Sequence, residues 1–450
     1  MKTLTSLLVV GLTLSTFSVP DTFANETGAA AQGSSESSEA QTPELQSENA
    51  DQDKSPTRVR RTQTLREVVY EKLEEARNFA DEGQFDQAME SLQRLEKRKR
   101  NSYERAMTHN MVAYVYSAQE DYANAILAYT DVIAIKNAPS SLKQTTLFTL
   151  AKLHMIEENF DQSLVTLNEW MAATDKVKAD AYVLRAQVQY QRQQYEAARD
   201  DIATAISLRQ EHGKSVAENW YLLQRAALFQ LKDYPALATN LEALVAHYSK
   251  SDYWVQLAAV YNELGRADEE LATLETAYDQ GLLKKESELL NFAQALLGKE
   301  IPVKAASVLQ QGLDADIIEA SARNLSLLGD AWMMAKEYDQ AIISMTAAAD
   351  ASGKGSDYFK LAQIYTERQD WQQALTFSHR ALQAGDLKAP YQAMIVKGLA
   401  QYNLDALEDA SATFFAASRY PQAEKVAHQW QEYIEGEQSR REYIASSGLY

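Results

Sequence analysis

The stretch LLGDAWMMAKEYDQAIISMTAAA, from Leu327 to Ala349, carries the pattern that decides the fold. A small residue, Gly329, is followed by an aromatic residue three positions on, by another aromatic residue nine positions on, and by alanine three positions further. The stretch KLAQIYTERQDWQQALTFSHRAL, from Lys360 to Leu382, repeats this pattern with Ala362 at the small position. A pattern that recurs at a fixed period of this length indicates a stacked array of helical repeats.

The pattern recurs ten times along the chain, with a mean spacing of about 36 residues. Each copy predicts two amphipathic helices joined by a short polar turn such as Lys336-Glu337. Small residues are needed at two positions of each copy because two helix backbones approach closely there. Arg225, Leu237 and Glu270 depart from this rule, which predicts irregular packing in the fifth and sixth repeats. The predicted repeat starts are Val69, Ala106, Gln144, Ala179, Glu218, Ser251, Glu286, Ala322, Gly355 and Tyr391.

The period and the two small positions resemble those of the tetratricopeptide repeat (TPR) family over nearly the whole helical part of the chain. The resemblance implies an all-α, TPR-like α-solenoid, a right-handed superhelix of about ten helix-turn-helix repeats. It also implies that the first helix of each pair lines a concave groove, with positions five, nine and twelve facing inward. On that register the candidate partner-binding residues are Tyr114, Lys152, Gln187, Tyr190, Phe229, Asn262, Gln294, Asp330, Gln363 and Tyr402. Aromatic and uncharged polar side chains of this kind suit an extended peptide or a partner helix, and they do not match the Lys/Asn/Arg carboxylate clamp of chaperone-binding TPR domains.

The sequence predicts four segments. Residues 1–24 have the pattern of a signal peptide, with Lys2, an apolar run from Leu4 to Val19 and a Thr22-Phe23-Ala24 cleavage site. An uncleaved N-terminal anchor is the alternative. Residues 25–57 form a low-complexity linker that we expect to be disordered, residues 58–420 the repeat array, and residues 421–450 a C-terminal capping helix and tail. After cleavage we expect no stable membrane span and a location in the periplasm.

Composition excludes several kinds of chemistry. The chain has 63 acidic against 44 basic residues and a formal net charge of −19, so nucleic acid is not an expected partner. The local basic runs RVRR (Arg58–Arg61) and EKRKR (Glu96–Arg100) are either solvated helix ends or contacts for an anionic partner. Cysteine is absent, which excludes disulfides and thiol chemistry. No catalytic, metal-binding or cofactor motif is found, and we expect SGKGS (Ser352–Ser356) to be an inter-repeat loop rather than a phosphate loop.

Several segments resemble a narrower group. SYERAMTHNMVA (Ser102–Ala113), ENWYLLQRAALFQLKDY (Glu218–Tyr234), DYWVQLAAVYNELG (Asp252–Gly265), AYDQGLLKKESELLNFAQALL (Ala277–Leu297) and AHQWQEYIE (Ala427–Glu435) are similar to the exported TPR protein that accompanies TonB systems of Gram-negative bacteria. The resemblance implies a periplasmic, non-enzymatic scaffold that binds protein partners, among them a TonB–ExbB–ExbD-type complex. The alternatives are a scaffold for peptidoglycan or outer-membrane assembly, and an enzyme subunit whose site the sequence does not reveal.

Overall fold

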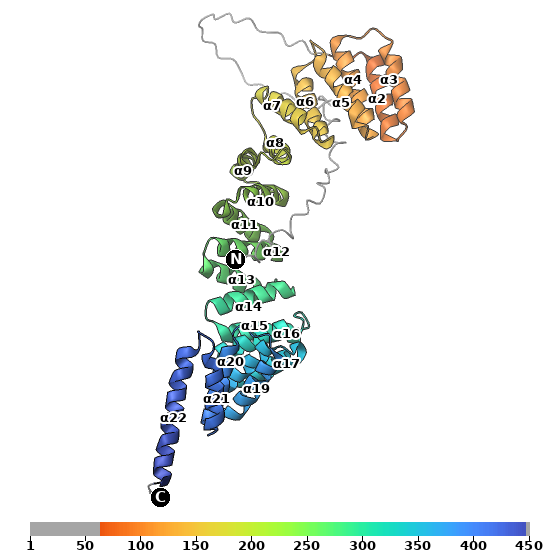
Figure 1. Cartoon of the computed structure of the whole chain (residues 1–450). Helices are drawn as coiled ribbons and strands as arrows, with labels where there is room; N and C mark the ends of the chain where they lie inside the picture. Colours follow the sequence, from red (N-terminus) through yellow and green to blue (C-terminus); the bar gives the residue numbers. More distant parts are fainter. Residues whose placement is uncertain (1–63, 447–450) are drawn as a thin grey trace, which may run out of the picture. The chain divides into compact units, whose positions relative to one another are not determined.

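The computed structural model describes residues 64–446 of the chain. The predicted signal peptide, residues 1–24, and the predicted linker, residues 25–57, lie outside these residues. Between residues 64 and 446 the chain forms 21 α-helices and no strand, as the repeat pattern predicts (Figure 1). No helix within this range has the combination of length and apolarity that crossing a membrane requires.

The first twenty helices follow one another along the chain as ten pairs, in which we call the first member the A helix and the second the B helix. The A helices are α2 (Glu67–Asp81), α4 (Ser102–Ala118), α6 (Ser140–Ile156), α8 (Ala179–Gln191), α10 (Glu218–Leu231), α12 (Ser251–Glu263), α14 (Glu286–Gly298), α16 (Ala322–Met334), α18 (Gly355–Glu367) and α20 (Pro390–Asn403). The B helices are α3 (Phe85–Glu96), α5 (Tyr122–Ala134), α7 (Phe160–Ala172), α9 (Tyr195–Glu211), α11 (Tyr234–Tyr248), α13 (Ala267–Asp279), α15 (Pro302–Asp314), α17 (Tyr338–Ser352), α19 (Trp371–Ala384) and α21 (Leu407–Ser418). The last helix, α22, spans Glu424–Ser446.

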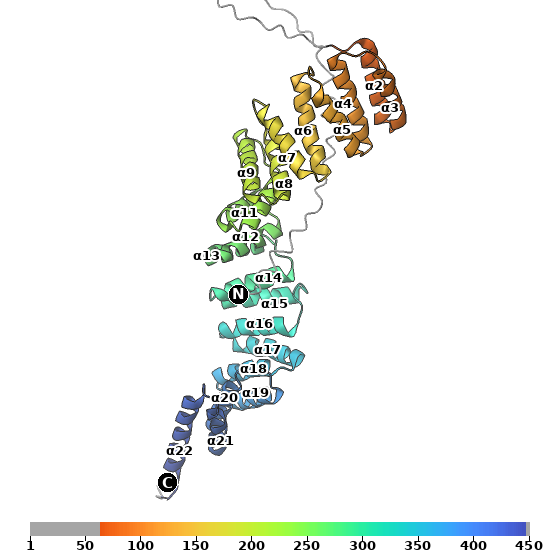
Figure 2. The same cartoon turned by 45° about the horizontal axis from the view of Figure 1, so that its top comes forward.

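The predicted repeat register is confirmed by the helix boundaries. Six A helices, α8, α10, α12, α14, α16 and α18, begin at the predicted residue. The other four begin one to four residues earlier; the difference is largest for α4 and α6, which begin at Ser102 and Ser140 instead of Ala106 and Gln144. Figure 2 shows the later pairs, from α12 to α19, layered one after another.

Each pair is closed by one residue with left-handed backbone geometry at the turn between its helices. Glycine fills this position only in the first and sixth pairs, at Gly83 and Gly265. The other eight turns use residues with a side chain, such as Lys336 at φ 61° and Gln369 at φ 59°. An L-residue with a side chain is disfavoured in this region by about 1–2 kcal/mol, so packing of the two helices must hold these turns in place.

Small side chains lie where the two helices of a pair meet. Ala76, Ala88, Ala341 and Ala374, for example, are completely buried. At Gly398 an added Cβ would lie 2.8 Å from the Phe414 ring, so even alanine would crowd this interface. The two small positions therefore behave as the repeat pattern predicts.

The sequence predicted irregular helix packing in both the fifth and the sixth pair. The two pairs do not share such an irregularity. In the sixth pair Ala258 and Leu274 belong to one core, and Glu270 is half-buried with its carboxylate accepting a hydrogen bond from Asn262 Nδ2 at 2.7 Å. A polar partner thus lets Glu270 remain at the surface without separating the helices. The described residues divide into two compact units between Ala236 and Leu237, in the fifth pair, where both small positions carry large side chains.

Neighbouring pairs are connected by buried carboxylates in the first turn of an A helix. In the first unit the fully buried Glu104 accepts from Arg66 Nε at 2.7 Å and from the backbone N–H of Asn101 at 2.9 Å. In the second unit Glu288 accepts from Ser251 Oγ and from the backbone N–H of Lys284, both at 2.8 Å. Each carboxylate fixes the start of its helix to the preceding A helix, an arrangement that the repeat pattern did not predict.

The C-terminal helix α22 covers the last pair, beside α21 (Figure 1). The Trp430 ring stacks on Phe414 with 5.5 Å between centroids and 4° between planes, and Ile434 is completely buried. The buried face follows the spacing Ala423, Ala427, Trp430, Ile434. Val426 and Tyr433 lie off this face and are 40% and 58% exposed.

Candidate functional site

All ten predicted groove residues lie on A helices, and none of them is buried. Asn262, Gln294 and Gln363 are exposed, and the other seven are half-buried. The register therefore places them at the surface of the A helices, while their role in binding stays a prediction.

In the second and third pairs, the predicted groove residues Tyr114 and Lys152 already have partners. Tyr114 Oη donates to Asp81 Oδ1 at 2.5 Å, and burial together with this bond raises the pKa of Tyr114 to about 12. Its ring borders a cavity of about 60 Å³ between α2, α4 and the start of α6. Lys152 Nζ lies 4.8 Å from the centroid of the Phe148 ring. These side chains form a mainly apolar surface with few free polar groups.

Tyr190 and Phe229, two aromatic residues of the predicted groove, are both half-buried. The Tyr190 ring packs edge-on against Tyr195 of α9, with 5.3 Å between centroids. Burial raises the pKa of the Tyr190 hydroxyl, and a hydrogen bond with Gln230 of α10 opposes this shift. Replacing Tyr190 with alanine would remove these contacts and lower stability measurably, so a binding test at this position needs a Tyr190→Phe control.

Tyr402, the last predicted groove residue, lies under α22. Its ring centroid is 5.4 Å from that of Trp430 and 5.5 Å from that of Tyr433. In this structure Tyr402 therefore belongs to the C-terminal cap, because α22 occupies the surface that the next A helix would cover.

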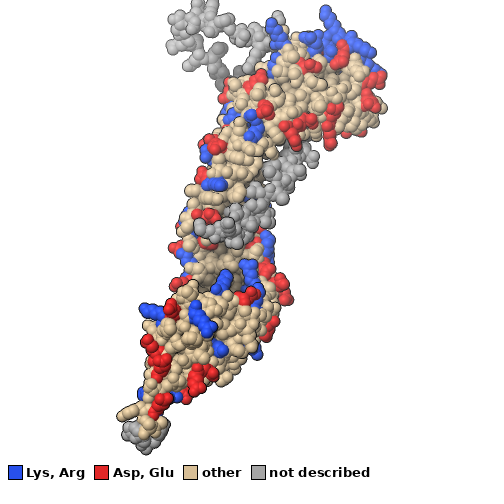
Figure 3. Space-filling model, in the orientation of Figure 1, with Lys and Arg blue, Asp and Glu red and all other residues tan. Residues whose placement is uncertain are grey.

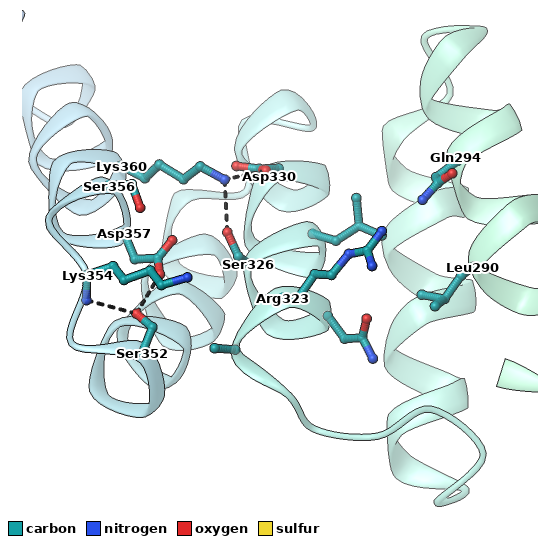
Figure 4. Close-up of a pocket in the computed structure, with 13 residues that line it drawn as sticks. Leu290, Gln294, Arg323, Ser326, Asp330, Ser352, Lys354, Ser356, Asp357 and Lys360 are labelled. Atoms are coloured by element: carbon teal, nitrogen blue, oxygen red, sulfur yellow. Dashed lines mark hydrogen bonds and ion pairs between the residues drawn. The ribbon is translucent and has the colours of Figure 1, made fainter. Parts of the chain in front are cut away.

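The second unit contains a polar pocket of about 390 Å³ between α14, α16 and α18 (Figure 4). Two predicted groove residues, Gln294 of α14 and Asp330 of α16, line it. Gln363 is not among its lining residues. The pocket spans three successive A helices and includes these two predicted groove residues.

Part of the pocket is held by internal hydrogen bonds. Lys360 Nζ contacts Asp330 Oδ2 at 2.6 Å and donates to Ser326 Oγ at 2.9 Å (Figure 4). Ser352 Oγ donates to Asp357 Oδ2 at 2.6 Å. The ion pair with Lys360 neutralises Asp330, whereas the hydrogen bond from Ser352 orients the Asp357 carboxylate and leaves its charge.

Two cations of the pocket remain without an ionic partner. Arg323, at the start of α16, and Lys354, just before α18, are both exposed, and neither makes an ion pair with any residue that the structure describes. Figure 4 shows them on different walls of the pocket. A guanidinium and an ammonium that face one polar cavity favour an anionic group, and the carboxylate is the anionic group that peptides carry.

The SGKGS segment forms one edge of this pocket. Ser352 ends α17, Gly353 adopts φ 64°, and Gly355 begins α18, so the segment connects two pairs as expected. Ser356 is not in a loop, however: it lies in the first turn of α18. Ser352 Oγ accepts from the backbone N–H of Lys354 at 3.1 Å, a contact that shapes the connection.

The sequence prediction included Asp330 but missed the cations of the pocket. Arg323 occupies the second position of its A helix and Lys360 the sixth, whereas the register used positions five, nine and twelve. The signal available in the sequence was a basic side chain at position two of one repeat, Arg323, and another at position six of the next, Lys360. Among residues 64–446 no group of three His, Cys, Asp or Glu side chains is placed to hold a metal ion.

Comparison with known protein families matches the start of the repeat array. Residues 73–141, which span most of the first two pairs, match the tetratricopeptide repeat family. No curated protein is significantly similar to the chain in sequence.

Solved structures give weak likenesses. A TPR protein from Parabacteroides merdae is 16% identical with a TM-score of 0.35, over 63% of this chain and 93% of that one. YrrB, described as a TPR protein with an unusual peptide-binding site, is 13% identical with a TM-score of 0.33, over 43% and 92%. The Naa15/Naa10 complex bound to HypK-THB gives 13% identity and a TM-score of 0.40, over 81% and 66%.

Proposed function

We propose that this chain is a non-enzymatic scaffold that binds an extended segment of a protein partner across α14, α16 and α18. The observation that carries the proposal is the 390 Å³ polar pocket on three successive A helices, with Arg323 and Lys354 exposed and unpaired. TPR repeats serve protein–protein interaction, which agrees with a surface of this kind.

The pocket fits one acidic side chain or a chain-terminal carboxylate of the partner. Lys360 is already bound to Asp330, so Arg323 and Lys354 are the groups left to receive the incoming charge. Gln294, exposed on α14, supplies an amide that can both donate to and accept from the partner backbone. An acidic residue flanked by extended backbone is therefore the expected recognition element.

We further propose that the protein acts in the periplasm as an accessory of a TonB-type energy-transduction system. Support comes from the signal-peptide pattern of residues 1–24 and from the segments that resemble the exported TPR protein of such systems. The TonB–ExbB–ExbD-type complex is then the proposed partner. A scaffold for peptidoglycan or outer-membrane assembly is the alternative.

Site-specific photo-crosslinking in intact cells tests both levels of the proposal. A photoreactive residue replaces Gln294 in the pocket, and the matched control replaces Ile343, which is 64% exposed on the B helix α17 of the same unit. We expect adducts from position 294 that contain a TonB-system protein and none from position 343. Adducts with envelope-assembly proteins would favour the alternative, and equal adducts from both positions would overturn the pocket as the binding site.

A further inference from the structure

A cluster of positive charge lies at one end of the first helix pairs, in a chain whose net charge is −19. In an antiparallel pair the start of the A helix, the end of the B helix and the connection to the next pair all lie at the same end. Arg66 at the start of α2 shows this directly, because its Nη2 donates to the backbone oxygen of Lys99 in the α3–α4 connection at 2.6 Å. We call this surface the basic end; it consists of Arg66, Lys97, Arg98, Lys99, Arg100, Arg105 and Lys136.

The cations at the tip of this surface are free to act on something outside the chain. Lys97, Arg98, Lys99 and Arg105 are exposed, and none makes an ion pair with the residues that the structure describes. The carboxylates nearby are Glu67, Glu96 and Asp131, which are exposed, and the buried Glu104, which is bound to Arg66. The seven cations of the basic end therefore outnumber these four carboxylates.

The opposite end of the same pairs is acidic. The turns within the first three pairs carry Glu82, Glu120, Asp121, Glu157 and Glu158. Figure 3 shows Lys and Arg gathered along one edge of the first helices and Asp and Glu along the other. The first unit is thus polarised along its helices.

This separation of charge selects the geometry of the partner. Helix α4 has 17 residues, so it is about 25 Å long, which is several times the Debye length of about 8 Å at physiological salt. A flat anionic surface that meets the basic end is screened from the acidic end. A polyanion lying along the helices would meet both ends and be repelled by one.

The basic end also carries apolar and aromatic side chains. Val68 and Tyr70, in the first turns of α2, are 45% and 47% exposed. Tyrosine side chains beside cations are typical of surfaces that lie at a membrane–water interface. We propose that the basic end docks on the anionic surface of a phospholipid membrane. This proposal goes beyond partner binding in the pocket and does not depend on it.

Vesicle flotation with the full chain tests the proposal. The probe is vesicles that contain phosphatidylglycerol, and vesicles of phosphatidylcholine alone serve as the reference. Because any apolar segment binds both kinds of vesicle, the measured quantity is the preference for the anionic ones. We expect the parent to prefer anionic vesicles at low salt and to lose this preference at high salt.

The triple variant Lys97→Gln, Arg98→Gln, Lys99→Gln should lose about fivefold in anionic binding per cation, or about 100-fold in total. The matched control neutralises three exposed cations of the second unit, Lys336, Lys388 and Lys425, with the same change of net charge. It should bind like the parent. Circular dichroism checks that both variants keep the helical content of the parent.

Three outcomes would overturn the proposal. The parent could show no preference for anionic vesicles, or the triple variant could bind them as the parent does. A duplex DNA fragment could also bind the parent as tightly as the vesicles and be lost in the same variant, which would make nucleic acid the partner. Crosslinking from position 294 is expected to be unchanged in the triple variant, so failure here is distinguishable from failure of the proposed function.

Discussion

Replacement of Gly355 by alanine should destabilise the second unit strongly. Gly355 begins α18 and lies against the connection between α19 and α20. An added Cβ would lie 1.9 Å from the backbone oxygen of Gly385 and 2.6 Å from that of Ala381. Real Cβ contacts essentially never fall below 3.0 Å, so the backbone would have to move by about 1.1 Å. A carbonyl oxygen cannot rotate away as the end of a side chain can.

The size of the effect follows from two opposing contributions. Overpacking of a closely packed interface costs about 1–3 kcal/mol, and occasionally more. Alanine gains at most about 1 kcal/mol over glycine in helix propensity, and less at the first position of a helix. We therefore expect a net loss of about 2 kcal/mol. The movement would also displace Ser356 and Asp357, which line the pocket, so partner crosslinking from position 294 should fall.

Urea unfolding followed by circular dichroism measures this change, with Gly436→Ala as the matched control. An added Cβ at Gly436, inside the exposed part of α22, would meet no atom within 4 Å. The same substitution should there stabilise the helix by about 1 kcal/mol. If Gly355→Ala unfolds at the urea concentration of the parent or above it, the close approach of α18 to Gly385 is wrong.

Three further predictions concern acid stability, a turn and the pocket. Hydrogen bonds from Arg66 lower the pKa of Glu104 from 4.5 to about 2, so the stability that this carboxylate contributes is present above pH 4.5 and is lost as the pH falls towards 2. Glu104→Gln should be less stable than the parent at pH 7, and the difference should shrink between pH 4.5 and 2; a constant difference in thermal melts across this range would contradict the pairing. Lys336→Gly should stabilise the eighth pair by about 0.5–1 kcal/mol. Glycine accepts the left-handed turn without strain, and its larger loss of backbone entropy on folding offsets part of this gain. Unfolding at the urea concentration of the parent or below it would refute the strain at this turn. The double variant Arg323→Glu, Lys354→Glu should keep the free energy of unfolding within about 0.5 kcal/mol of the parent's, since both side chains are exposed. It should weaken capture of the partner at least tenfold, and unchanged capture would exclude the pocket as the binding site.

The sequence by itself determined the class of fold, the number of helix pairs and their register. These follow from local rules: the period of apolar and small residues sets each helix, and Ala341 or Ala374 can be recognised because two backbones approach only where side chains are small. The turns at Lys336 and Gln369 were likewise located by their polar residues. Each of these features depends on residues within one repeat, so it can be read without knowing the neighbours.

Only the tertiary structure decided which surfaces remain free. Tyr402 has the register of a groove residue, yet α22 covers it, because the face that a terminal helix buries is set by the pair it packs on. The same packing turned Val426 outward and buried Ala423. The pocket joins side chains from three repeats, and whether Arg323 is free while Asp330 is neutralised depends on where Lys360 of the next repeat points. Such contacts arise between repeats, and the spacing of residues within one repeat cannot specify them.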